Sequence, residues 1–103
     1  MSEGVDRLLQ LALEKGALKY GDFTLTSGKK STYYFDGRLL SLDPEGAYLI
    51  SQSLLPVLRQ AGVEAVGGPT LGADPIVASI ALASHINETP IPAFIVRKEA
   101  KSH

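Results

Sequence analysis

The sequence predicts an α/β fold in which an N-terminal helix and a β-hairpin precede a βαβ unit. Three observations support this. Apolar residues recur at near-helical spacing over residues 5–15, and large and polar side chains alternate over residues 20–36. Two short apolar segments, residues 63–68 and 90–96, flank a helical pattern. A right-handed crossover would make these two segments parallel, so they are expected to begin a parallel sheet.

The first two elements follow from local patterns. The helix is expected over residues 5–15 because its apolar residues share one face, and Gly16 is a typical stop. Residues 20–27 and 31–36 are rich in aromatic and β-branched residues, and the turn between them contains Gly28. These features predict an antiparallel hairpin.

A second helix is predicted to begin at Asp43, which is a good N-cap, with Pro44 and Glu45 in its first turn. It should run to about Gln60. Pro56 lies inside this span, where proline costs a helix roughly 3 kcal/mol. Two outcomes therefore stay open: the helix kinks at the proline, or it breaks into two.

The βαβ unit is predicted from residue 63 onward. Residues 63–68 form a short buried strand, residues 67–75 a glycine-rich turn, residues 73–86 an apolar helix, and residues 90–96 a second strand. Parallel strands with continuous apolar runs normally have neighbouring strands and helices on both faces. Residues 1–103 therefore predict an unfinished sheet, which stops where the next helix or strand is expected to begin.

The composition is that of one ordinary soluble domain and excludes several classes. The chain has 103 residues, 45% of them hydrophobic, and a formal net charge of −1. It has no cysteine, which excludes disulfides and thiolate metal sites, and no apolar run long enough to span a membrane. A mildly acidic body with a basic final segment argues against general nucleic-acid binding. A cytoplasmic protein is expected, because no signal-peptide pattern is present.

Residues 67–75 are the first candidate binding segment, because they follow a strand and open a helix. Open α/β sheets bind ligands at this edge, where backbone N–H groups and the helix N-terminus attract phosphate. The alternative is a tight turn that uses glycine only for its backbone freedom. Spacing alone favours that alternative, since the segment matches neither a Walker loop nor a GxGxxG motif.

A second candidate segment follows the other strand. Arg97, Lys98, Lys101 and His103 would suit a pyrophosphate, although a run of charges is more often a solvated face. Because the carboxyl ends of parallel strands share one edge, this segment and the turn at residues 67–75 together indicate a single phosphate-binding crevice.

The aromatic pair Tyr34 and Phe35 is the third candidate. Aromatic rings can cover a planar ligand, but they also favour strands, so a core strand is the preferred alternative from the pattern alone. His85 is expected to be an ordinary surface or core residue. The pattern contains no metal-ligand cluster.

Four segments together resemble one family. Residues 17–31 (ALKYGDFTLTSGKKS), 34–36 (YFD), 68–75 (GPTLGADP) and 97–103 (RKEAKSH) are similar to bacterial orotate phosphoribosyltransferases. The resemblance implies a hood at residues 1–40, made of the helix and hairpin. It also implies that residues 41–103 begin a type I phosphoribosyltransferase core with a Rossmann-like parallel sheet, so that residues 1–103 form a single partial domain.

The activity implied by the resemblance is pentosyl transfer in pyrimidine (UMP) biosynthesis. Orotate and phosphoribosyl pyrophosphate would give orotidine 5'-monophosphate and pyrophosphate, with Mg²⁺ carried by the substrate and active sites shared within a homodimer. Lys101 would be catalytic. The other implied contacts are Tyr34 and Phe35 with orotate, and Thr70, Leu71, Gly72, Arg97, Lys98, Lys101 and His103 with phosphoribosyl pyrophosphate.

The chain departs from the family pattern in three respects. Many relatives have lysine at the positions of Thr26 and Gly72. The acidic strand end and threonine- and glycine-rich loop of the family's phosphoribosyl pyrophosphate motif have no match in residues 1–103, so a fragment that is inactive alone is expected. The alternatives are a purine phosphoribosyltransferase, a non-catalytic ligand-sensing domain of the same fold, and a unit serving only folding or dimerisation.

Overall fold

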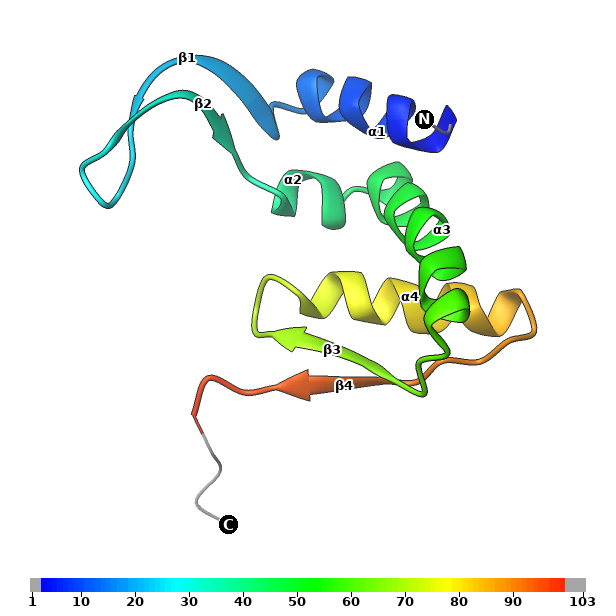
Figure 1. Cartoon of the computed structure of the whole chain (residues 1–103). Coiled ribbons are helices and arrows are strands. Elements are labelled where there is room, and N and C mark those ends of the chain that lie inside the picture. Colours follow the sequence, from blue (N-terminus) through cyan, green and yellow to red (C-terminus); the bar gives the residue numbers. More distant parts are fainter. Residues whose placement is uncertain (1–2, 100–103) are drawn as a thin grey trace.

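The computed structural model describes residues 3–99 and has the predicted α/β organisation (Figure 1). An N-terminal helix and an antiparallel hairpin lie on one side of a long central helix. A two-stranded parallel sheet and its connecting helix lie on the other side. The elements in chain order are α1 (Glu3–Glu14), β1 (Leu18–Thr24), β2 (Lys30–Phe35), α2 (Arg38–Ser41), α3 (Pro44–Ala61), β3 (Val66–Pro69), α4 (Asp74–Ile86) and β4 (Ala93–Val96).

The predicted hairpin is confirmed. Strands β1 and β2 pair antiparallel with Leu18 opposite Phe35 and Tyr20 opposite Tyr33, and the register shifts between Tyr20 and Phe23. Such a shift is typical of a β-bulge, in which one strand carries an extra residue. The hairpin begins at Leu18, two residues earlier than predicted, because the chain leaves α1 directly into the strand.

The central helix α3 begins and ends as its sequence predicts. The Asp43 side chain accepts a hydrogen bond from the Gly46 backbone N–H at 2.9 Å, and Gly62 closes the helix at φ 68°. Pro56 lies on the exposed side of one uninterrupted helix, so the helix is not broken in two. The short helix α2 was not predicted, because a single turn is too short to show helical periodicity.

The parallel pairing of β3 and β4 is confirmed, with Val66 opposite Ala93 and Pro69 opposite Val96. Both strands are shorter than predicted and begin three residues later. In the second strand the cause is proline: neither Pro90 nor Pro92 has an N–H to donate to the ladder. The Pro92 carbonyl instead accepts from Val66 N at 2.9 Å, just before the ladder begins.

Helix α4 packs on one face of this sheet and Phe94 lies on the other. A Cβ added to Gly68 would lie 2.6 Å from the Ala73 Cβ, so glycine allows the strand to approach the start of α4. On the opposite face the Phe94 ring covers Gly67. Within residues 3–99 no helix covers that opposite face (Figure 1), and Phe94 and Ile95 are 52% and 67% exposed. Within the described residues the uncovered face agrees with the prediction of an unfinished sheet. The prediction of a buried strand at residues 63–68 is wrong, because no residue of β3 is fully buried.

Two apolar clusters hold the fold together. The first lies beneath α1 and comprises Leu11, Ala12, Ala17 and Leu40. The second lies between α3, α4 and the sheet and comprises Leu55, Ile80, Ala83 and Ile91. Helix α3 contributes to both, since Leu49 and Ile50 pack on the first and Leu58 on the second. None of the described helices combines the length and apolar character needed to cross a membrane.

Candidate functional site

The carboxyl ends of β3 and β4 meet, as the parallel pairing predicts. Thr70 N donates to the Val96 carbonyl at 3.2 Å, one residue beyond the last strand pair. The turn that contains Thr70 therefore lies beside Arg97 and Lys98, which follow β4 directly. The structure brings these two predicted segments together, while their role in binding stays a prediction.

The turn between β3 and α4 is held by its own backbone. Ala73 N donates to the Pro69 carbonyl and Asp74 N to the Leu71 carbonyl, both at 3.1 Å. The Thr70 hydroxyl donates to the Asp74 carboxylate at 3.4 Å, and the peptide bond between Thr70 and Leu71 is cis. These contacts shape the turn without using all of its donors.

Two donors of this turn are free for a ligand. Within the described part of the chain, the N–H groups of Leu71 and Gly72 make no hydrogen bond. Leu71 is 79% exposed, and a Cβ added to Gly72 would meet no atom within 4 Å. Free backbone N–H groups just before a helix N-terminus suit an oxyanion. The Asp74 carboxylate in the first turn of α4 opposes this attraction, so nearby cations are needed for tight anion binding.

The nearest cations come from the segment after β4. Arg97 and Lys98 are exposed, and neither forms a salt bridge with another residue of the 3–99 range. Both are thus available to an anionic ligand. Lys101 and His103 lie outside the described residues, so their predicted roles stay predictions.

Tyr34 and Phe35 lie near the base of the hairpin, on opposite faces of β2, because successive strand residues alternate. The Tyr34 ring lies beside the ring of Phe23, with 5.9 Å between the two ring centres and an interplanar angle of 38°. Phe35 lies opposite Leu18 and close to Gly37. The two rings are 45% and 54% exposed, so the core-strand alternative is wrong for both. One flat ligand on a single face of the hairpin can contact only one of them fully.

Phe23 is a candidate that the sequence analysis missed. With Asp22, Lys30, Ser31 and Thr32 it lines a concave surface of about 690 Å³ on the hairpin. A regular register would pair Phe23 with Lys30, four residues from Tyr34, whereas the shift between Tyr20 and Phe23 pairs it with Ser31, so strand alternation alone does not predict the contact. Lys30 donates to the Thr24 hydroxyl at 2.9 Å on the same part of the hairpin.

The hairpin and the turn after β3 extend toward the same side of the molecule (Figure 1). Among residues 3–99 no hydrogen bond or ion pair joins the hairpin to the β3–β4 sheet. Thr26, in the hairpin turn, is exposed. At the base of the hairpin the Arg38 guanidinium donates two hydrogen bonds to the Asp36 carboxylate, at 3.0 and 3.1 Å, and lowers the pKa of that carboxyl.

The described residues do not provide a protein-built metal site. No group of three or more histidine, cysteine, aspartate or glutamate side chains in the range 3–99 is placed to hold an ion. His85 lies exposed in the last turn of α4.

Comparison with known proteins shows one consistent relationship. The chain is 48% identical over 99 residues to the orotate phosphoribosyltransferase of Nostoc sp., a match covering 96% of this chain and 45% of the relative. It is 53% identical over 87 residues to that of Synechocystis sp., covering 84% of this chain and 43% of the relative. No family model matches the chain.

Solved structures agree with the sequences. The orotate phosphoribosyltransferase of Mycobacterium tuberculosis, determined in complex with 5-phospho-alpha-D-ribosyl 1-diphosphate, matches with a TM-score of 0.68 at 33% identity. The match covers 94% of this chain and 57% of that one. The chain spans about half the length of the curated relatives it matches. This protein is thus a relative of the orotate phosphoribosyltransferases, similar to them over most of its own length and about half of theirs.

Proposed function

We propose that this chain provides the orotate-covering hairpin and the pyrophosphate-binding edge of an orotate phosphoribosyltransferase. The observation that carries the proposal is the hydrogen bond from Thr70 N to the Val96 carbonyl, which places the turn with the free N–H groups of Leu71 and Gly72 beside the segment of Arg97 and Lys98. These groups lie at the strand edge where this type of sheet binds ligands. Over the matched residues the chain is 48% and 53% identical to two relatives named orotate phosphoribosyltransferase.

The proposed reaction transfers a phosphoribosyl group to orotate. Orotate N1 forms a bond to C1 of the ribose while the bond from C1 to the pyrophosphate oxygen breaks, and the electron pair leaves with pyrophosphate. Charge therefore grows on the leaving group. Donors and cations aimed at that group stabilise the transition state more than the ground state.

Residues have distinct roles in this proposal. Thr70, Leu71 and Gly72 contact the pyrophosphate through the turn, while Arg97 and Lys98 supply positive charge. Tyr34 or Phe35 stacks on orotate, and the alternation of β2 restricts full stacking to one of the two. The catalytic role of Lys101 and the phosphate contact of His103 belong to the proposal as well.

Mg²⁺, a homodimer and a cytoplasmic location complete the proposal. The ion would be bound by the oxygens of phosphoribosyl pyrophosphate, the kind of ligand that Mg²⁺ prefers. Bound there, it would neutralise charge on the leaving group. A second copy of the chain would supply part of each active site.

The test measures the turnover of orotate in the presence of phosphoribosyl pyrophosphate and Mg²⁺. Turnover is monitored as the loss of orotate absorbance. The chain is assayed alone and together with the carboxyl-terminal half of the Synechocystis relative. We expect turnover in the mixture and none from the chain alone. The lack of turnover in the mixture, with both parts folded, would contradict the proposal. Consumption of a purine base in place of orotate would favour a purine phosphoribosyltransferase.

A further inference from the structure

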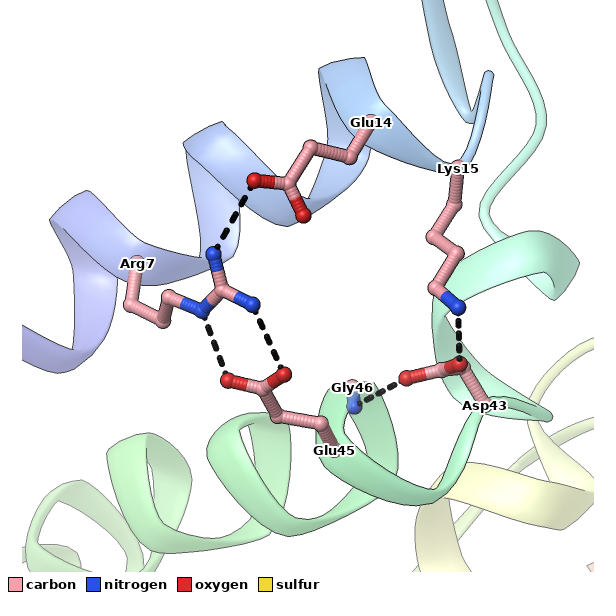
Figure 2. A network of polar contacts seen from close by, with 6 residues as sticks. All are labelled: Arg7, Glu14, Lys15, Asp43, Glu45 and Gly46. Carbon is pink, nitrogen blue, oxygen red and sulfur yellow. Dashed lines mark hydrogen bonds and ion pairs between the residues drawn. The ribbon is translucent and has the colours of Figure 1, made fainter.

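A polar network connects α1 to the start of α3 (Figure 2). The Arg7 guanidinium donates two parallel hydrogen bonds to Glu45, from Nε to Oε2 at 2.6 Å and from Nη2 to Oε1 at 2.9 Å. Its third nitrogen, Nη1, donates to Glu14 at 3.3 Å. This two-point geometry fixes the orientation of the arginine as well as its distance, which a single ion pair does not.

A second ion pair joins the same two segments further along α1, just beyond its last residue. Lys15 Nζ lies 3.3 Å from Asp43, whose carboxylate also caps α3 through the Gly46 N–H. Asp43 and Glu45 both have a lowered pKa. The main causes are the Gly46 N–H for Asp43 and the Arg7 hydrogen bonds for Glu45. Both carboxylates are therefore charged at neutral pH, and α1 is held to α3 at two separated points.

The apolar contact beneath α1 is concentrated toward its C-terminal end. Leu11, Ala12 and Ala17 are 1%, 4% and 0% exposed, whereas Val5, nearer the N-terminus of α1, is 38% exposed. Such a cluster resists separation of the two helices but does little to fix the angle between them. Arg7, one turn before the cluster, is placed where a contact with α3 controls that angle.

The hairpin is attached directly to the end of α1, so its position depends on the orientation of that helix. Gly16 turns the chain at φ 75°, Ala17 is fully buried, and β1 begins at Leu18. The Ala17 carbonyl also accepts a hydrogen bond from Asp36 N at 2.7 Å, so both strands of the hairpin are attached to the end of α1. A rotation of α1 on α3 would thus swing the hairpin, and with it Tyr34.

We propose that Arg7 is a positioning residue: with Glu45 it fixes the angle of α1 on α3 and thereby holds the hairpin at a set distance from the β3–β4 edge. The inference rests on the proposed function in one respect, that the hairpin is the element covering the base. Arg7 itself touches no proposed substrate atom.

The test measures hairpin position without substrate. The chain has no cysteine, so Lys29→Cys in the hairpin turn and Gln60→Cys at the end of α3 give two unique spin-label sites. Both positions are exposed and form no side-chain hydrogen bond with other described residues. Distances between the labels are recorded by pulsed electron paramagnetic resonance for the parent, Arg7→Met, Glu45→Gln and the double variant.

We expect one narrow distance distribution in the parent and a distribution at least twice as broad in Arg7→Met. Glu45→Gln should broaden it too, and the double variant should be no broader than Arg7→Met, because both substitutions break the same contact. Asp6→Asn is the matched control, since it also removes a charge from α1 but its side chain makes no hydrogen bond or ion pair with the described residues. It should leave the distribution unchanged.

Unchanged distributions in Arg7→Met and Glu45→Gln, with circular dichroism showing folded protein, would overturn the inference. It is overturned as well if the melting temperature falls while the distances stay fixed, because the pair would then stabilise the fold without positioning the hairpin. Glu45→Gln keeps the size and an acceptor oxygen of the native side chain, so it provides a folded variant if Arg7→Met does not fold. The distances are recorded without orotate turnover, so a negative result leaves the proposed function standing.

Discussion

The two sheets of this molecule are built on different principles. The β1–β2 hairpin is antiparallel, its strands are joined by a short turn, and four of its five aromatic residues, those at positions 20, 33, 34 and 35, are 45–72% exposed. The β3–β4 pair is parallel, joined through the whole of α4, and depends on close approach at Gly68 and on the buried cluster around Leu55. The hairpin is therefore a local structure that presents side chains, whereas the parallel pair is a packed structure that presents backbone and strand ends.

Because of this difference, substitutions in the two regions should affect stability to different degrees. Stability should depend mainly on the cluster between α3, α4 and the sheet, and much less on the exposed rings of the hairpin. Ligand binding should instead depend mainly on exposed groups of the hairpin and of the strand edge, because the groups proposed to bind ligand are exposed in both regions.

The largest effect is expected from Leu55→Ala. Leu55 is 1% exposed and packs against α4, so truncation should lower the free energy of unfolding by about 2–5 kcal/mol. Urea denaturation followed by circular dichroism measures the change. Leu54→Ala is the matched control, because Leu54 is 36% exposed on the same helix and should cost much less. Equal losses at the two positions would remove the basis for treating this cluster as the core.

Gly68→Ala tests the close approach of β3 to α4. The added Cβ would lie 2.6 Å from the Ala73 Cβ, and relief of this overlap should cost about 1–3 kcal/mol of unfolding free energy. Gly72→Ala adds the same methyl group where no atom lies within 4 Å. It should therefore change stability by less than about 0.5 kcal/mol. If Gly68→Ala leaves the free energy of unfolding unchanged, the turn does not depend on this contact.

Gly72→Lys tests whether the turn after β3 binds pyrophosphate. The open space at this position accommodates a longer side chain, and a cation beside the free N–H groups should strengthen pyrophosphate binding roughly tenfold, about 1.4 kcal/mol. Isothermal titration with pyrophosphate measures the affinity. Gln60→Lys adds the same charge at the far end of α3 and should leave it unchanged; similar gains in both variants would indicate general electrostatic attraction.

Tyr20→Ala tests how little the hairpin rings contribute to stability. Tyr20 is 72% exposed and lies directly opposite Tyr33, a pairing worth roughly 0.2–1 kcal/mol in an antiparallel sheet. The change in the urea midpoint should be correspondingly small. A loss as large as that of Leu55→Ala would mean that the hairpin belongs to the cooperative core.

The smallest effect should be a loss of stability in acid. Asp36, Asp43 and Glu45 each have a pKa lowered in the folded state, so their contribution is present above the unfolded pKa of about 4 and is lost as pH falls through the folded pKa. The melting temperature should be flat from about pH 7 to 5 and fall below about pH 4. In Glu45→Gln the fall should be shallower. A melting temperature that rises on acidification would contradict the direction of these pKa shifts.

Much of the fold was predictable because its signals are local. Asp43, Pro44 and Gly62 set the limits of α3, and Gly28 and the alternating aromatic residues determine the hairpin. The strand, turn, helix and strand order of the second half restricts the pairing to a parallel one. The grouping of the turn at residues 70–72 with Arg97 and Lys98 followed from that pairing alone.

Tertiary structure decided what local patterns leave open. Whether α3 continues through Pro56 depends on the helix being packed between two clusters, which outweighs the cost of one missing hydrogen bond. The contact between Phe23 and Tyr34 depends on a bulge, and the Arg7–Glu45 pair joins residues 38 positions apart. Sequence by itself determined every helix and strand except α2, and also the edge where the candidate anion-binding groups lie, since these follow from periodicity and strand direction. Only packing in three dimensions determined which side chains meet, because contacts between distant residues leave no periodic trace in the chain.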